Sequence, residues 1–89
     1  MKNTQGYIYR GDGKLTVISV PFNNIGSYTN KGNYFIAPSK EDLITHFEKN
    51  YALLISNATT DEEKLKYEKT LETIVNDIIN GEVVEAKLT

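Results

Sequence analysis

The chain has 89 residues, of which 39% are hydrophobic and 25% are charged, and its formal net charge is −2. This length and composition predict a single folded domain and do not fit the profile of a disordered chain. The absence of cysteine excludes disulfides, thiolate metal ligands and a catalytic thiol. We expect a cytoplasmic protein, because no stretch has the length of a signal peptide's apolar region or of a membrane span.

Two short stretches rich in β-branched and aromatic residues, 6–10 and 14–22, predict two strands. The loop between them, residues 11–13, reads Gly-Asp-Gly and supplies glycines where positive φ angles are needed, so we expect a hairpin. Apolar residues occupy both faces of the second stretch, which predicts a central strand that is covered on more than one side. Pro21 has no N–H to donate, so strand pairing should fail near that residue.

The next strand candidates are residues 25–29, a short edge strand weakened by Gly26, and residues 34–37. A tight-turn composition, Asn-Lys-Gly-Asn, separates the two stretches. The N-terminal part of the chain, about residues 6–37, therefore predicts three or four strands.

A helix is predicted over about residues 40–57, with Ser39 as its N-cap and Asp42 as the capping partner three residues later. Apolar side chains recur every three or four residues and form one stripe on this helix. The stripe consists of Leu43, Ile44, Phe47, Tyr51, Leu54, Ile55 and Ala58.

A second helix is predicted over about residues 61–80, and its periodicity is the clearest in the chain. Thr60 and Glu63 have the spacing of a capping box, in which Glu63 reaches back to the cap residue. Gly81 is expected to end the helix in the left-handed conformation. The apolar stripe consists of Tyr67, Leu71, Ile74, Val75, Ile78 and Ile79. The short connection between the two helices predicts an antiparallel helical hairpin.

Alternating apolar and charged residues predict a final strand over about residues 82–88. The whole chain, residues 1–89, is thus expected to form one α+β domain. We expect a small, mostly antiparallel sheet with the two-helix hairpin packed on one of its faces.

The sequence offers no usable catalytic constellation, so we expect no enzyme, no cofactor and no metal site. His46 is the only histidine, whereas a zinc site usually draws on several His or Cys ligands, and a partly exposed structural role is expected for it. No serine has the Gly-x-Ser-x-Gly context of a nucleophile elbow. The stretch around Lys14 departs from a P-loop, because Ile8 stands at the first glycine position and Leu15 at the hydroxyl position.

Charge is divided unevenly along the chain. Residues 1–38 carry four cations and one carboxylate, a balance of +3, whereas residues 39–89 carry six lysines and eleven carboxylates, a balance of −5. An acidic surface can occupy a basic groove on a partner, although exposed helix faces also carry such charges for solvation alone. The weak candidates for partner binding are Glu62, Glu63, Glu68, Glu72, Tyr7, Tyr9, Arg10 and Tyr34.

Our leading hypothesis is a non-enzymatic binding protein that occupies a surface of a larger host protein. The plentiful Asn, Lys, Ile and Thr suggest an A/T-rich genome, and the narrower hypothesis is a phage or mobile-element inhibitor of a host nucleic-acid-handling defence enzyme. The alternative is single-stranded nucleic-acid binding, in which exposed tyrosines stack on bases and cations meet phosphates. A homodimer is a further alternative, because both faces of the second predicted strand are apolar.

Overall fold

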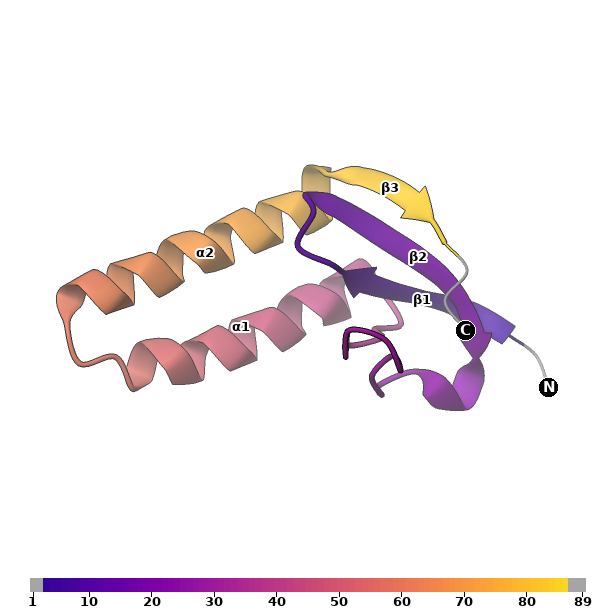
Figure 1. Ribbon diagram of the computed structural model, residues 1–89, viewed down its shortest axis with the longest axis horizontal. Coiled ribbons are helices and arrows are strands. Elements are labelled where there is room, and N and C mark those ends of the chain that lie inside the picture. Colours follow the sequence, from indigo (N-terminus) through magenta and orange to yellow (C-terminus); the bar gives the residue numbers. More distant parts are fainter. Residues whose placement is uncertain (1–2, 87–89) are drawn as a thin grey trace.

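The computed structural model describes residues 3–86, in the order strand, strand, short 3-10 helix, helix, helix, strand (Figure 1). The bounds are β1 Asn3–Tyr9, β2 Lys14–Pro21, η1 Phe22–Asn24, α1 Lys40–Ser56, α2 Asp61–Asn80 and β3 Glu82–Glu85. The α+β class and the two contacting helices packed on the sheet are confirmed. None of the helices among these residues is both long and apolar enough to cross a bilayer.

Strand β2 is the middle strand of a three-stranded sheet with the order β1-β2-β3. It is buried on both faces, as its sequence predicts: Leu15 is 0% exposed on one face, and Ile18 is 2% exposed on the other. Strand β1 pairs with it antiparallel across the predicted hairpin, and Tyr9 lies opposite Leu15. Register and burial therefore agree with a central strand.

The sheet separates two clusters of buried side chains. The cluster on the helix side consists of Leu15, Ala37, Leu43, Ile74 and Ile78. The cluster on the opposite side consists of Ile8, Ile18, Val20 and Ile36. The segment of residues 22–37 supplies Ile36 to this second cluster, with Ile25 and Tyr34 packed against it, so the sheet lies between the helices and an irregular layer.

The segment of residues 22–37 does not form the two strands that its composition predicts. The only pairings there, within the described residues, are single bridges that join Tyr28 to Phe35 and Tyr7 to Ala37. Gly26 has a positive φ of 87°, which interrupts the first stretch. Backbone hydrogen bonds join Gly26 and Ser27 to Ile36, but residues 22–37 form no continuous ladder.

Strand β3 pairs with β2 in parallel, so the sheet is mixed, with one antiparallel and one parallel pair. Helix α2 returns the chain to the β1–β2 turn, where Glu82 pairs with Lys14, and β3 then runs in the direction of β2. In β3, Val84 is half-buried while Glu82, Val83 and Glu85 are exposed. The last residues of the predicted strand, 87–88, lie outside the described residues.

Gly81 ends α2, but it adopts an extended conformation (φ −70°, ψ 161°) instead of the predicted left-handed one. A Cβ at this position would collide with the carbonyl oxygens of Asp77 and Gly13. The glycine is therefore needed for the close approach between the end of α2 and the β1–β2 turn. That approach places β3 beside β2.

Both helices begin at the predicted caps. The Ser39 hydroxyl accepts a 3.1 Å hydrogen bond from the Asp42 amide, and the Thr60 hydroxyl accepts one of 3.1 Å from the Glu63 amide. The Glu63 carboxylate accepts from the amide of Thr59 at 3.3 Å, so it reaches one residue beyond the cap residue that a capping box uses.

The two helices extend well beyond the sheet and give the molecule dimensions of 48 × 24 × 21 Å (Figure 1). Leu43 is buried near the start of α1, and Ile74 and Ile78 are buried near the end of α2. No residue in the fully described stretch between Leu43 and Ile74 is buried to the same degree. We call residues 48–73 the helical arm: its two helices pack on each other, and the sheet covers only the other ends of α1 and α2.

Candidate functional site

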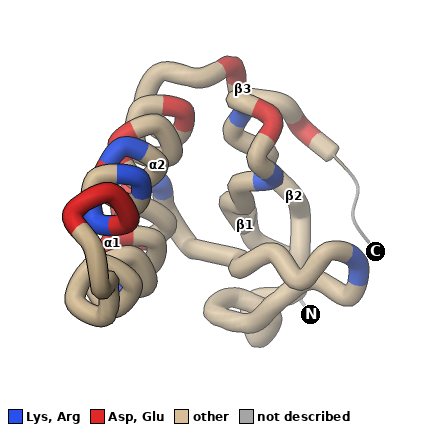
Figure 2. The backbone as a smooth tube through the Cα atoms, turned by 60° about the vertical axis from the view of Figure 1, so that its left-hand side comes forward, with Lys and Arg blue, Asp and Glu red and all other residues tan. Residues whose placement is uncertain are grey.

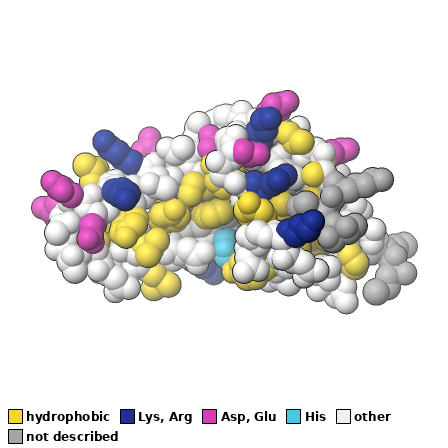
Figure 3. Space-filling model, in the orientation of Figure 1, with side chains coloured by type: hydrophobic (Ala, Val, Ile, Leu, Met, Phe, Trp, Pro, Cys, Tyr) yellow, Lys and Arg dark blue, Asp and Glu magenta, His cyan; other side chains and the backbone are white. Residues whose placement is uncertain are grey.

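The helical arm exposes large apolar side chains that no other described element covers. Leu53 is 65% exposed, Leu65 is 53% exposed and Leu54 is 42% exposed. The half-buried rings of Tyr51 and Tyr67 meet between the helices at a centroid distance of 6.4 Å, which holds the arm together. In Figure 3, apolar side chains follow the line between the two helices. Three leucines of the arm are therefore largely exposed to solvent, which can mark an interaction surface.

A shallow groove of about 530 Å³ runs along the arm toward the sheet. It is lined by Glu48 from α1 and by Glu68, Leu71, Glu72, Val75, Asn76 and Ile79 from α2. The three carboxylates combine with three aliphatic side chains, and no Lys or Arg of the described chain is among the lining residues. We call this feature the acidic groove. Two of the predicted binding residues, Glu68 and Glu72, lie together in it.

The other two acidic candidates lie apart from the groove. Glu62 and Glu63 are exposed in the first turn of α2, and the Glu63 carboxylate is engaged by the Thr59 amide. The helical repeat places Glu62 on a different face of α2 from Glu68 and Glu72. Acidic and basic positions alternate along the arm in Figure 2. The four acidic candidates therefore do not form one patch.

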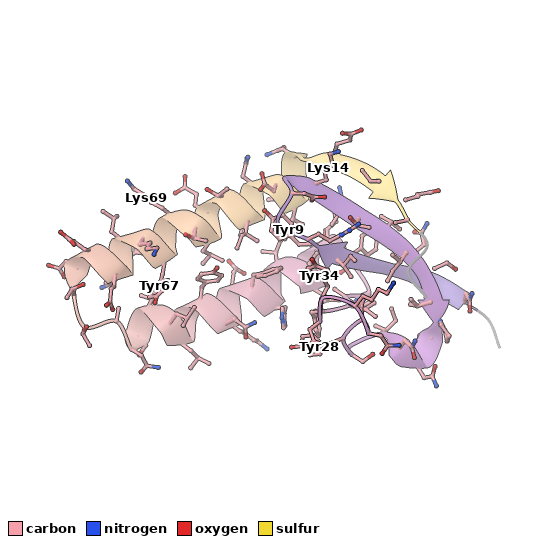
Figure 4. All side chains as sticks on the ribbon, in the orientation of Figure 1. Tyr9, Lys14, Tyr28, Tyr34, Tyr67 and Lys69 are labelled. Carbon is pink, nitrogen blue, oxygen red and sulfur yellow. The ribbon has the colours of Figure 1, made fainter. Side chains whose placement is uncertain are left out.

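Tyr9 is half-buried between the sheet and the helices. Its hydroxyl donates a 2.6 Å hydrogen bond to Oδ2 of Asp77, and its ring meets Phe47 edge to face at 5.7 Å. Burial, together with the hydrogen bond to Asp77 and its negative charge, raises the pKa of Tyr9 to about 12. Figure 4 shows this side chain at the junction of the sheet with the helices. Tyr9 thus serves packing between elements.

The remaining N-terminal candidates point to different surfaces. Tyr7 packs against the helix-side cluster, whereas Tyr34 packs against the cluster on the opposite side of the sheet. Arg10 is exposed beside the β1–β2 turn. Tyr28, outside this set, is the most open N-terminal tyrosine, at 53% exposed. The predicted tyrosines therefore do not form a single platform for stacking bases.

His46 lies half-buried in an aromatic cluster near the start of α1. Its ring stacks on Phe35 with a centroid distance of 3.8 Å and an interplanar angle of 3°. Phe47 and Tyr28 approach it at 5.6 Å and 6.2 Å. Burial lowers the pKa of His46 below its ordinary value of 6.5, because desolvation disfavours the charged form. This environment supports structural packing, and within residues 3–86 no group of three or more potential metal ligands gathers anywhere.

No family model matches this chain, and comparisons with curated proteins and with solved structures found no significant similarity.

The partner-binding candidates chosen from the sequence do not include Glu48 or the aliphatic lining of the acidic groove. The periodicity places Val75 and Ile79 in the apolar stripe of α2, but Val75 is half-buried and Ile79 is 53% exposed. A stripe that is wider than the helix it packs against leaves such residues at its margin. A wide apolar stripe on α2 with glutamates beside it is the sequence feature that could have indicated this groove.

Proposed function

We propose that this protein is a non-enzymatic, cytoplasmic binding protein that acts by occupying a surface of a larger partner protein. The observation that carries the proposal is the helical arm, with Leu53 65% exposed and Leu65 53% exposed at a distance from both buried clusters. Large exposed apolar side chains are frequent at protein interfaces. The buried clusters are formed by residues outside the arm, so the exposed side chains of the arm are available for contact.

The narrower form of this proposal names the partner as a host nucleic-acid-handling defence enzyme, inhibited by a phage or mobile-element protein. Its support is the balance of six lysines and eleven carboxylates in residues 39–89, which include the helical arm. Carboxylates on a rigid helix can stand where nucleic-acid phosphates would otherwise bind, and their field speeds docking on a basic surface.

The direct test is site-specific photo-crosslinking with the full, tagged chain in a lysate of its host. A photoreactive residue replaces Leu53 or Leu65 in the arm, and a matched control carries it at Asn23, which is exposed in η1 on the far side of the sheet. We expect a cross-linked protein from the arm positions and little from Asn23. Equal labelling from all three positions, or none from any, would contradict the proposal.

The nucleic-acid alternative retains one supporting observation. Tyr28 and Lys31 both line a cavity of about 290 Å³ between the end of β2 and the irregular layer, so an aromatic face and a cation share one site. Fluorescence anisotropy with labelled single strands, at low salt and with Tyr28→Ala as the variant, tests this idea. Absence of binding at low salt would remove it, because electrostatic attraction is strongest there.

A further inference from the structure

We infer that the acidic groove binds a basic amphipathic helix of the partner protein. This inference rests on the proposed function, since it names the chemistry of the segment that the arm recognises. Its lining combines the aliphatic side chains of Leu71, Val75 and Ile79 with three carboxylates, Glu48, Glu68 and Glu72, which we call its rim.

The length and direction of the groove suit a helix. From Glu68 to Ile79 the lining follows α2 over twelve residues, a rise of roughly 16 Å at 1.5 Å per residue, which matches about three turns. Because α1 and α2 lie side by side, the groove between them is parallel to both axes, and a third helix can lay its apolar stripe there. Exposed Ile79 offers the contact nearest the sheet.

The negative charge of the rim favours a positively charged helix in the groove. Glu48 comes from one helix and Glu68 and Glu72 from the other, so an occupant between them meets carboxylates on both sides. Lys64 and Lys69 lie within one turn of Glu68 and Glu72 along α2, but neither lines the groove. Lysines or arginines flanking the occupant's apolar stripe would therefore find oppositely charged neighbours along both edges.

The same charges argue against a second copy of this chain as the occupant. In a two-fold symmetric contact, the same patch meets itself. Glu48, Glu68 and Glu72 of one protomer would then face the same three carboxylates of its partner across an apolar surface. Such like-charge contacts are unfavourable, whereas a basic helix removes the repulsion.

The probe is a synthetic 14-residue helical peptide with leucines on one face and lysines on the rest. Its control has glutamates in place of the lysines. Binding to the intact protein is measured by fluorescence anisotropy. Glu68→Lys/Glu72→Lys reverses the charge of the rim. Glu62→Lys/Glu85→Lys produces the same change in net charge away from the groove, because neither residue lines it.

We expect the lysine peptide to bind and the glutamate peptide not to bind. The rim variant should weaken the affinity for the lysine peptide by about tenfold or more, and the matched control by less than about threefold. Ile79→Ser should also weaken binding, by about fivefold, because it removes apolar contact without changing charge. Circular dichroism should show increased helix content when the lysine peptide binds.

Equal losses in the rim variant and its matched control would overturn the inference, because binding would then depend only on net charge. The inference would also be overturned if Ile79→Ser left peptide binding unchanged. A dimer detected by sedimentation that the rim variant dissociates would overturn it as well. Photo-crosslinking from Leu53 and Leu65 distinguishes failure of the helix-binding groove from failure of the proposed function. If those positions still label a partner while peptide binding ignores the rim, the proposed function stands and the acidic groove does not contribute.

Discussion

The hydroxyl of Tyr9 donates a 2.6 Å hydrogen bond to the carboxylate of Asp77, across 68 positions of the sequence. It joins strand β1 to the end of α2, at the place where the helices leave the sheet. Together with the ring contact between Tyr9 and Phe47, it sets how the helical arm projects. The direction of the arm depends on this junction.

Tyr9→Phe should lower the free energy of unfolding by about 1–2 kcal/mol, because Asp77 keeps its half-buried carboxylate and loses its donor. Urea unfolding followed by circular dichroism measures the change. Tyr7→Phe is the matched control, since the Tyr7 hydroxyl makes only a 3.4 Å contact with Gln5, and its effect should stay within about 0.5 kcal/mol. Equal losses in the two variants would argue against the Tyr9–Asp77 contact.

The same junction should make the protein sensitive to alkali. The pKa of Tyr9 is about 12 in the folded protein and 10.0 in its ordinary state, so the unfolded chain loses this proton first. The contribution of Tyr9 to stability is complete below pH 10 and is lost as the pH rises toward 12. Unfolding measured from pH 9 upward should show a steeper loss in the native sequence than in Tyr9→Phe. Parallel curves would contradict the raised pKa.

His46 should make stability fall on mild acidification. Its pKa is lowered by burial, so below about pH 6.5 the unfolded chain takes up the proton before the folded one does. The contribution of His46 to the free energy of unfolding should therefore not change with pH above that value. Below it, the free energy of unfolding should decrease as the pH falls. NMR titration of the single histidine ring should give a pKa under 6.5, and His46→Gln should flatten the decrease. A ring pKa above 6.5 would refute this account.

Gly81→Ala should destabilise the fold by about 1–3 kcal/mol, because the new methyl group meets the carbonyl oxygens of Asp77 and Gly13. Strand β3 follows directly, so its amides should exchange faster with solvent, and so should that of the next residue, Ala86, which donates to the Val17 carbonyl at 3.0 Å. Hydrogen exchange followed by NMR measures both effects. Asn80→Ala, at the exposed preceding residue, should change stability by less than about 0.5 kcal/mol.

The leucines of the arm should matter little for folding. Leu53→Ala and Leu65→Ala should each change the free energy of unfolding by about 0.5 kcal/mol or less, because both side chains are more than half exposed. Leu43→Ala should cost about 2–5 kcal/mol, because Leu43 is 0% exposed in the helix-side cluster. A loss of that size at Leu53 or Leu65 would mean that the arm leucines stabilise the monomer, and the argument for a partner surface would weaken.

Much of the local structure follows directly from the order of the residues. The repeat of apolar residues predicts both helices, and Ser39 and Thr60 mark their first turns, because caps and helical periods act within a few residues. The apolar residues on both faces of β2 likewise predict its central position, since a strand buried on both sides needs them.

Relations between distant segments were decided only by the tertiary structure. The parallel pairing of β3 depends on where α2 returns the chain, and the segment of residues 22–37 became a covering layer because its residues find partners on β1 and in one another. The acidic groove and the Tyr9–Asp77 contact each join elements that no sequence window contains together. Local patterns specify which residues form helices and strands, whereas the packing of those elements decides which charges and apolar side chains remain outside for a partner.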